Sequence, residues 1–152
     1  MYEVEVRELE EQPTAVIRSR VEEDQLGPWF AGSFGALATH LQSIDVATVG
    51  LPFARCAEGA DAYDVEAGLP VAMAITPDNG IEPSSLPGGP AAATWHRGAY
   101  ATARPAYTAI ADWLERNGCE PAGPPWETYH SDTATDLDET TWITEVIQPF
   151  TR

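Results

Sequence analysis

Tyr63-Asp-Val-Glu66-Ala-Gly-Leu-Pro70-Val71 and Trp142-Ile-Thr-Glu145-Val-Ile-Gln-Pro149-Phe150 repeat one pattern at two places in the chain. In each, an aromatic residue is followed by a glutamate three positions later, and then by a proline and an apolar residue at the end of the segment. A pattern of this length, found twice, is typical of a duplicated unit.

Three further pairs of similar segments occur in the same order along the chain. They begin at Pro13 and Pro90, at Phe34 and Tyr107, and at Pro52 and Pro125. The spacing between partners changes by only a few residues from pair to pair, as it does when a duplicated unit diverges mainly in its loops. The sequence therefore predicts one domain over residues 1–152 made of two repeats, at about 1–78 and 79–152. A cleft between related halves is a natural ligand site.

The two repeats are expected to contain the same elements. Alternation and turn residues predict strands at about 2–8, 15–21, 51–57, 62–66, 69–75, 91–97, 126–130 and 141–147, a short one near 81, and an acidic hairpin loop at 132–139. Helical spacing of apolar residues predicts helices at about 29–43 and 105–116. Two amphipathic helices can cover only one face of the strands. The expected fold is therefore α+β, with two pseudo-twofold-related βαββ-type repeats that form a curved antiparallel sheet, both helices on one face and a ligand cleft on the other.

The chain is strongly acidic, with 24 aspartates and glutamates against 8 arginines, no lysine and a net charge of −16. Such a surface repels phosphate backbones and attracts cations, so we expect no direct nucleic-acid binding. A general solubility bias, such as salt adaptation, explains the same balance without a ligand. No apolar run reaches membrane-spanning length and the first residues do not resemble a signal peptide. The sequence therefore predicts a cytoplasmic protein without a membrane partner.

The cysteines and histidines do not form a metal motif. Cys56 and Cys119 are far apart in sequence, and reduced thiols are expected rather than a disulfide or a metal site. His40, His96 and His130 lack the close spacing of metal ligands or catalytic triads. No glycine-rich loop follows a predicted strand and opens a helix, so nucleotide binding is not supported. The sequence predicts no cofactor and no metal.

Four motifs of the second repeat carry a family resemblance. They are Arg97-Gly-Ala-Tyr100; Ala106-Tyr107-x-x-Ile110-x-x-Trp113-Leu114-x-x-Asn117-Gly118; Gly123-x-Pro-Trp126-Glu127-x-Tyr129; and Thr144-Glu-Val-Ile-x-Pro149-Phe150. Together they resemble the GyrI-like small-molecule-binding domain, which also forms the effector-binding half of some AraC-type and MerR-type multidrug-responsive regulators. The resemblance covers essentially the whole chain. It implies two βαββ-type repeats about a pseudo-dyad, in agreement with the duplication.

The resemblance also implies a function. Family members bind bulky, often aromatic and cationic compounds in a cleft where a buried glutamate lies opposite aromatic walls, and by motif this glutamate is Glu127. Regulators of the family carry a helix-turn-helix segment, for which this chain has no spare residues, so we expect a stand-alone form. Some stand-alone members are similar to hydrolases that open cyclopropane rings of DNA-alkylating natural products, and another inhibits DNA gyrase.

The segment around Glu127 has an informative pattern of its own. If residues 126–130 are extended, Glu127 and Tyr129 face one way and the residues beside them face the other. The equivalent positions of the first repeat hold Ala54 and Cys56, so only one repeat supplies a carboxylate. Spacing alone favours an ordinary exposed glutamate, and the family resemblance reverses that preference. A carboxylate among aromatic rings is costly to ionise unless a cation or a donor such as the Tyr129 hydroxyl compensates.

Aromatic residues on or beside the predicted strands are candidates for the walls of the site. They are Trp95, Trp126, Trp142, Tyr63 and Tyr100. Each of them is explained as well by ordinary core packing, and Trp113 on the second helix is expected to pack rather than to contact a ligand. Glu66 and Glu145 hold aligned positions in the two repeats, which favours a symmetric structural role and makes them second-choice carboxylates.

The primary interpretation is a stand-alone sensor or sequestering protein for bulky hydrophobic, aromatic or cationic small molecules, bound in a cleft between the repeats. The alternative is a hydrolase of cyclopropane-bearing genotoxic natural products, with Glu127 and Tyr129 as catalytic residues. A second alternative is a gyrase-inhibitor-like interaction module. The first two share every candidate residue, so the sequence leaves open whether the protein is an enzyme. It also leaves a homodimer open.

Overall fold

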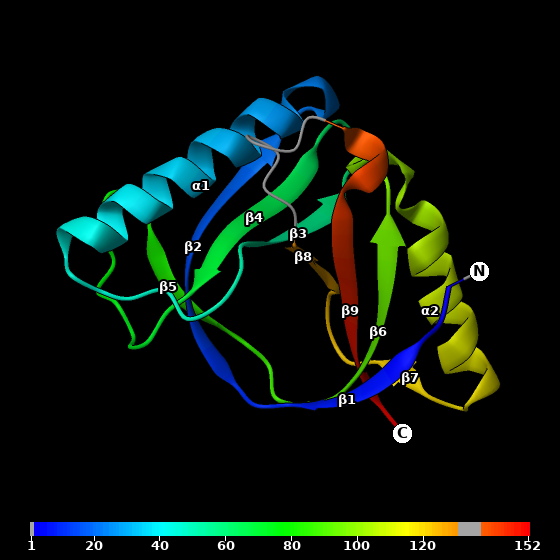
Figure 1. Ribbon diagram of the computed structural model, residues 1–152. Coiled ribbons are helices and arrows are strands. Elements are labelled where there is room, and N and C mark those ends of the chain that lie inside the picture. The colour runs from blue at the N-terminus through cyan, green and yellow to red at the C-terminus, as the bar shows by residue number, and fades with distance from the viewer. Residues whose placement is uncertain (1, 131–137) are drawn as a thin grey trace. The chain divides into compact units, whose positions relative to one another are not determined.

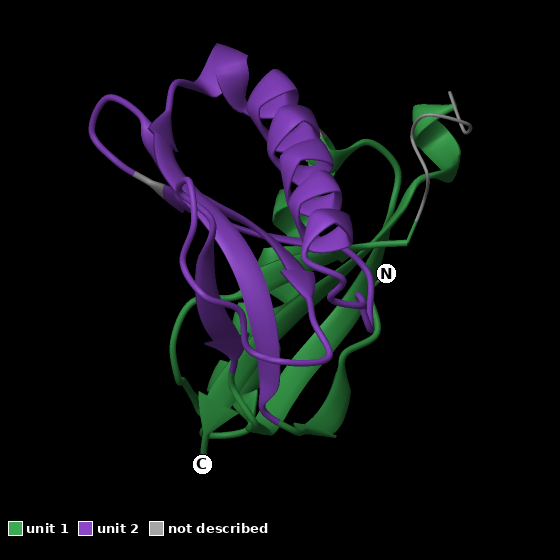
Figure 2. Ribbon diagram, turned by 90° about the vertical axis from the view of Figure 1, so that its left-hand side faces the viewer, with its two compact units in different colours: residues 1–10, 87–152 green, residues 11–86 purple. Residues whose placement is uncertain are grey.

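The structure is a computed structural model that describes residues 2–130 and 138–152 (Figure 1). The chain divides into two compact units, each with its own helix and antiparallel strands. Unit 1 is Met1–Glu10 with Pro87–Arg152, and unit 2 is Glu11–Leu86, as coloured in Figure 2. The two units are described in turn.

Unit 2 is a four-stranded antiparallel sheet with one helix on a single face. Its elements are β2 (Gln12–Val21), a 3-10 turn (Glu23–Gln25), α1 (Leu26–Ser43), β3 (Phe53–Glu58), β4 (Tyr63–Pro70) and β5 (Glu82–Leu86), with strand order β3-β4-β2-β5. In Figure 1, α1 lies along β2 and β4. Leu37 and Leu41 of α1 pack on Ala15 of β2 and Ala67 of β4. Alternate strand positions therefore bury the helix-facing side of this sheet.

The other face of the same sheet contains a close approach that requires glycine. Phe53 pairs with Gly68 in the register of β3 and β4. A Cβ atom at Gly68 would lie 2.2 Å from the Phe53 ring, so a larger residue there would displace the ring. The ring is buried, and its full burial stabilises the fold by about 1.5–3 kcal/mol.

Unit 1 repeats this arrangement around the second helix. Its elements are β1 (Glu5–Leu9), β6 (Gly89–Arg97), a 3-10 turn η2 (Tyr100–Thr102), α2 (Arg104–Arg116), β7 (Glu120–Pro121), β8 (Trp126–Tyr129), a 3-10 turn η3 (Glu139–Thr141) and β9 (Ile143–Thr151). The strand order is β1-β6-β9-β8, and β7 also pairs with β9. Ile110 and Leu114 of α2 pack on Ala92 of β6 and on Val146 and Phe150 of β9.

The edge strands connect to the sheets in an unexpected way. β1, at the start of the chain, pairs with β6 in unit 1, whereas β5 pairs with β2 in unit 2. Each strand therefore joins the sheet of the other half of the sequence. The repeat boundary near residue 78 stays a prediction, while the compact units change at residues 10–11 and 86–87.

The predicted α+β class, with antiparallel strands and one helix in each half, is confirmed. The two predicted strands at 62–66 and 69–75 are wrong in detail, because the chain forms one strand, Tyr63–Pro70, that ends at the proline. Proline has no N–H for the ladder, and only an isolated bridge between Thr48 and Val71 follows. Most of the predicted acidic loop at 132–139 lies outside the described residues. No helix in the described part of the chain is both long and apolar enough to cross a membrane.

Candidate functional site

The direction of the β8 side chains follows from the register of β8 with β9. Glu127 pairs with Val146 and Tyr129 with Thr144. Opposed residues of neighbouring strands point to the same side, and Val146 belongs to the core under α2. Glu127 and Tyr129 therefore point together, as alternation predicts, and they point to the face that carries α2. The sequence had placed the ligand cleft on the face opposite the helices, and these two side chains lie on the helix-bearing face instead.

Two phenol groups donate hydrogen bonds to the Glu127 carboxylate. The Tyr107 hydroxyl, from α2, donates to Oε1 at 2.5 Å, and the Tyr129 hydroxyl donates to Oε2 at 2.9 Å. Hydrogen bonds to an ionised oxygen are shorter and stronger than neutral ones, with O–H···O distances of about 2.5–2.7 Å. The Tyr107 bond lies in this range, so it is the stronger of the two.

A third tyrosine and a tryptophan complete the surroundings of this carboxylate. The ring of Tyr100 lies 4.8 Å from that of Tyr129 and 4.7 Å from that of Trp142, both in tilted geometry. These centroid distances are in the favourable range for aromatic pairs. All four aromatic side chains are half-buried. We call Glu127 with Tyr100, Tyr107, Tyr129 and Trp142 the Glu127 cluster.

The backbone around Gly98 holds Tyr100 and Trp142 together. Gly98 adopts a φ of +126°, a conformation that other residues rarely take, and its N–H donates to the Trp142 carbonyl at 2.8 Å. The buried His96 ring contacts the Thr102 hydroxyl at 3.0 Å through Nε2, which fixes the 3-10 turn that carries Tyr100. The aromatic part of the cluster is thus positioned by backbone as well as by ring contacts.

The cluster holds a negative charge among neutral donors. Among the residues that the structure describes, no arginine or histidine pairs with Glu127. Burial, and then the charge of Glu127, raise the pKa of the Tyr129 phenol well above its ordinary value. The same two causes raise the pKa of Tyr100. Both phenols therefore remain neutral at physiological pH. None of the residues at 2–130 and 138–152 gives the Glu127 carboxylate a cationic partner.

Glu66 and Glu145, which hold aligned positions in the two repeats, differ from Glu127 because each is paired with arginine. Glu145 lies on the opposite face of the sheet, is buried, and pairs with Arg7 and with His130 at 3.4 Å. Glu66 in unit 2 pairs with Arg18 at 2.8 Å and with Arg55 at 3.8 Å. Their shared role is that of buried, arginine-paired carboxylates.

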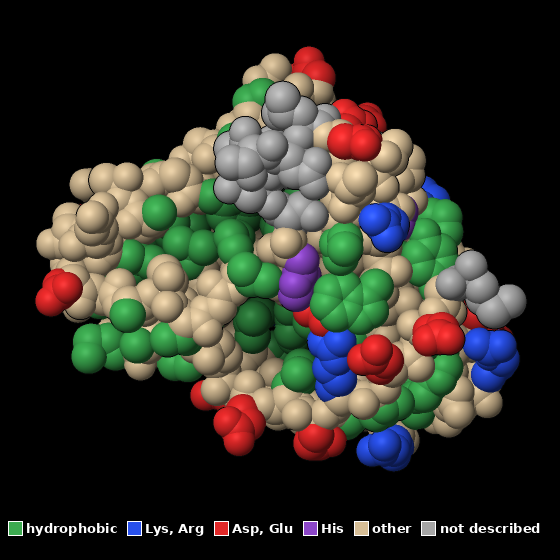
Figure 3. Space-filling model, in the orientation of Figure 1, with side chains coloured by type: hydrophobic (Ala, Val, Ile, Leu, Met, Phe, Trp, Pro, Cys, Tyr) green, Lys and Arg blue, Asp and Glu red, His purple; other side chains and the backbone are tan. Residues whose placement is uncertain are grey.

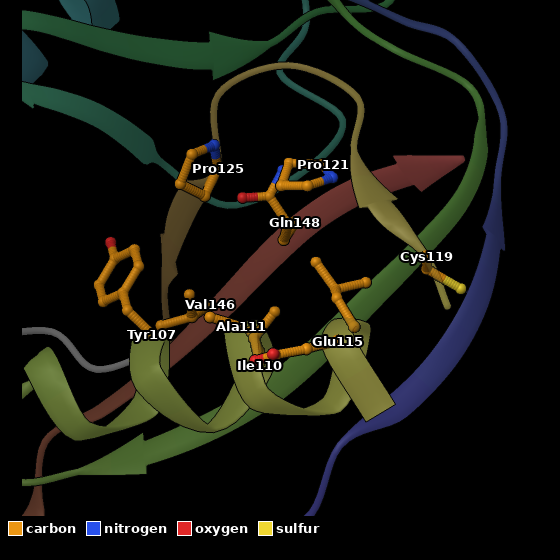
Figure 4. A pocket seen from close by; sticks show the side chains of 10 residues that line it. Tyr107, Ile110, Ala111, Glu115, Cys119, Pro121, Pro125, Val146 and Gln148 are labelled. Atoms are coloured by element: carbon orange, nitrogen blue, oxygen red, sulfur yellow. The ribbon is translucent and has the colours of Figure 1, made fainter. Parts of the chain in front are cut away.

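A cavity of about 270 Å³ lies beside the cluster, along α2 (Figure 4). It is lined by Tyr107, Ile110, Ala111, Leu114 and Glu115 of α2, by Cys119, Pro121 and Pro125, and by Val146 and Gln148 of β9. In Figure 4 the α2 side chains face those of β9 and of the segment that contains the prolines. Tyr107 lines this cavity and also donates to Glu127, so this one residue is common to the cavity and the cluster.

Two of the candidate wall residues lie elsewhere in unit 1, and for Tyr63, in the other unit, a place in the wall stays a prediction. Trp126 is buried on the other face of β8, opposite Ile147. Trp95 is exposed on β6, where its ring lies 4.7 Å from that of His130 and 5.8 Å from the Arg7 guanidinium. Tyr63 belongs to unit 2.

Tyr107 is the residue of the cluster that the sequence analysis missed, since its place in the apolar stripe of the helix indicated packing. A signal was present in the duplication. The first repeat has Phe34 and Ala54 where the second has Tyr107 and Glu127, so the hydroxyl and the carboxylate that it contacts occur in the same repeat.

Comparison with known proteins adds a family match. The model of the GyrI-like small molecule binding domain matches residues 2–151. No curated protein sequence matches the chain.

Several solved structures share the fold. The C-terminal domain of EcmrR superposes with a TM-score of 0.82 at 20% identity, over 100% of this chain and 99% of that one. EcmrR in its DNA complex gives 0.85 at 20% identity, over 99% of this chain and 58% of that one, so the chain spans little more than half of EcmrR. A hydrolase from Listeria innocua gives 0.70 at 12% identity over 97% and 91%, and SAV2435 bound to tetraphenylphosphonium gives 0.57 at 15% over 98% and 94%. At these identities the likeness concerns the fold alone.

Proposed function

Because the chain belongs to the GyrI-like small-molecule-binding domain family, we propose that it binds bulky hydrophobic cations at the Glu127 cluster, as a sensor or sequestering protein. The observation that carries the proposal is the charge of Glu127. Its carboxylate accepts from two phenols, and no arginine or histidine in the described part of the chain pairs with it. A cationic guest supplies the missing partner.

The energetics of the cluster favour such a guest. Each aromatic face that a cation meets contributes roughly 0.5–2 kcal/mol, in addition to the charge pair with the carboxylate. The phenol donors keep the carboxylate in place before the ligand arrives, which lowers the ordering cost of binding. A net charge of −16 raises the local concentration of cations, and acidic side chains are spread around the face shown in Figure 3.

The relatives support the choice of guest. SAV2435 was solved with tetraphenylphosphonium, a bulky aromatic cation, and EcmrR was solved on DNA. DNA binding is not part of our proposal for this chain, because its acidic composition repels phosphates.

A second candidate, the hydrolysis of cyclopropane-bearing compounds, is favoured by the pairing of a carboxylate with two phenols. A water oxygen would bond to a ring carbon as the ring C–C bond breaks, with the electron pair of that bond going to the departing carbon, and Glu127 would accept the proton of the water. Tyr107 or Tyr129 would protonate the departing carbon, and the proton on Glu127 would then return to the phenolate along their hydrogen bond. The gyrase-inhibitor alternative stays a prediction.

A comparison of two ligands of similar size tests the binding proposal. Tetraphenylphosphonium is cationic and triphenylphosphine oxide is neutral, and calorimetry with each gives the dissociation constant. Loss of a hydrogen-bonded charge partner costs about 1.5–3 kcal/mol, so E127Q should weaken binding of the cation about 10- to 150-fold. It should change the neutral ligand less than about threefold, since only ring contacts remain.

Asp112→Asn is the matched control, because Asp112 is exposed on α2 and its loss changes the net charge equally. It should leave both affinities unchanged. If E127Q lowers the affinity for both ligands equally, or if E127Q and D112N lower the affinity for the cation equally, then Glu127 does not contact the charge of the ligand. Incubation with a cyclopropane-bearing alkylator, followed by product analysis, separates binding from hydrolysis.

A further inference from the structure

The helix of unit 2 exposes a face that carries no charge. The 18 residues of α1, Leu26–Ser43, include no aspartate, glutamate, lysine or arginine. In Figure 3 the surface over α1 is mainly tan and green, the colours of uncharged groups. An exposed helix face of a globular protein is normally rich in charged and polar residues. We call the α1 face the exposed positions Ala31, Gly32, Gly35, Thr39, Gln42 and Ser43.

The equivalent helix of unit 1 follows the usual rule. In the alignment that pairs Phe34 with Tyr107, four exposed residues of the α1 face correspond to exposed charged residues of α2. The pairs are Ala31 with Arg104, Thr39 with Asp112, Gln42 with Glu115, and Ser43 with Arg116. Because both helices cover one face of a similar sheet, the architecture of the units does not require an uncharged surface on α1. Exposure to solvent alone therefore does not explain the α1 face.

The α1 face also leaves part of the helix backbone uncovered. Gly32 and Gly35 lie inside the helix, and a Cβ atom at either position would meet no neighbouring atom within 4 Å. Glycine stabilises a helix less than alanine does, and no close approach among the described residues calls for it here. A cavity of about 430 Å³, to which Ala38 and Gln42 contribute, adjoins the C-terminal end of the face. Another molecule can therefore approach the helix closely.

We propose that the α1 face docks on the same face of a second copy of this chain. Each copy carries a net charge of −16, so two copies repel each other unless they meet where acidic side chains are absent. In a twofold contact the same patch lies on both sides, so a charge close to the axis would meet its own copy. The uncharged α1 face satisfies both conditions.

A partner of another kind fits this face less well. A basic protein attracted by the acidic surface would bind where the carboxylates lie, since charge complementarity selects such partners. It would gain nothing from a helix that has lost its charges. The proposal concerns a surface of unit 2 only and does not depend on the Glu127 cluster.

The contact is expected to be reversible. A helix of 18 residues is about 27 Å long, at roughly 1.5 Å per residue. The crossing of two such helices buries less than the roughly 800 Å² per partner of a standard protein interface. The dimer should therefore form at concentrations between about 1 µM and 1 mM, and the average mass in solution should rise with concentration.

Analytical ultracentrifugation of the full chain over this range tests the proposal. The wild type should change from monomer to dimer. T39D gives α1 the residue that α2 has at the equivalent position, and T39K places the opposite charge there. Both variants should raise the dissociation constant of the dimer at least about 30-fold, because like charges then face each other across the contact or lie unpaired in it.

T108D and T108K are the matched controls, because Thr108 is exposed on α2 and the changes of side chain and net charge are the same. They should leave the dissociation constant within about twofold of the wild-type value, as distant independent sites do. Circular dichroism and urea unfolding of dilute protein show that each variant is folded. A wild type that stays monomeric, or equal effects of the Thr39 and Thr108 variants, would overturn the proposal. So would a dimer that one charge at Thr39 weakens and the opposite charge strengthens, since the partner surface would then be charged.

Discussion

The hydrogen bond between Tyr107 and Glu127 supports a prediction about stability. Y107F removes one hydroxyl and leaves the ring, and the first repeat already has phenylalanine at the equivalent position, Phe34. The lost bond is the 2.5 Å contact to Oε1, which leaves the half-buried carboxylate with the Tyr129 hydroxyl alone. Y107F should therefore destabilise the free protein.

The size of the effect follows from the type of bond. A hydrogen bond to a charged group contributes about 1.5–3 kcal/mol, and the partial exposure of both side chains places the expected value near the lower end. For a chain of this length, about 1.5 kcal/mol corresponds to a fall in Tm of roughly 3–6 °C.

Urea unfolding of a double-mutant cycle measures this interaction. Wild type, Y107F, E127Q and the double variant give the coupling free energy between the two side chains, which should be about 1–2 kcal/mol. The cycle separates the pair from the packing of the tyrosine ring, since the ring is present in all four proteins. A coupling below about 0.3 kcal/mol, which is within the additivity of independent sites, would refute the assignment of this bond as the main support of Glu127.

Three further predictions concern pH, the backbone and the opposite face. Burial and the charge of Glu127 raise the pKa of Tyr129, so the stability that this phenol contributes is fully present below its unfolded value of about 10 and is lost as the pH rises through the folded pKa. Urea unfolding between pH 9 and 11 should show this loss, and the loss should be smaller in Y129F, where only Tyr100 of the two phenols with a raised pKa remains. G98A places a side chain at a φ of +126°, so it should lower the free energy of unfolding in urea by about 1–3 kcal/mol and should weaken the binding of tetraphenylphosphonium. Unchanged binding would show that the backbone at Gly98 does not position the rings. E145Q leaves Arg7 without its buried partner, so it should lower stability by about 1–3 kcal/mol while calorimetry gives an unchanged cation affinity; a large loss of affinity would place the ligand on that face.

Strand alternation was enough to predict that Glu127 and Tyr129 point to the same side of their strand, but not which face of the sheet that side is. It places Glu127 and Tyr129 on one side of β8, and the structure has both on the side of α2. The same rule separates Trp126 from Glu127, since neighbours on a strand face opposite ways. An aromatic residue on a strand can therefore be assigned to the wall of the site only when the face of the sheet to which it points is known.

Contacts between distant elements were beyond such reasoning. Helical spacing identifies Tyr107 as part of an apolar stripe but carries no information about where its hydroxyl reaches. The exchange of β1 and β5 between halves is similar, because alternation predicts a strand and leaves its partner undefined. Trp95 satisfies the same local pattern as Trp142, and only the tertiary structure shows that Trp95 is exposed on β6 while Trp142 contacts Tyr100.

The central claim, that a cation binds beside Glu127, is tested most directly by a crystal structure of the protein with tetraphenylarsonium. The anomalous signal of arsenic locates the centre of the ligand without any assumption about its contacts. The account predicts a peak beside the Glu127 carboxylate and within about 6 Å of at least one ring of the cluster, the distance over which a cation and an aromatic face attract. A peak beside Glu145 or Glu66 instead, with none at Glu127, would contradict it.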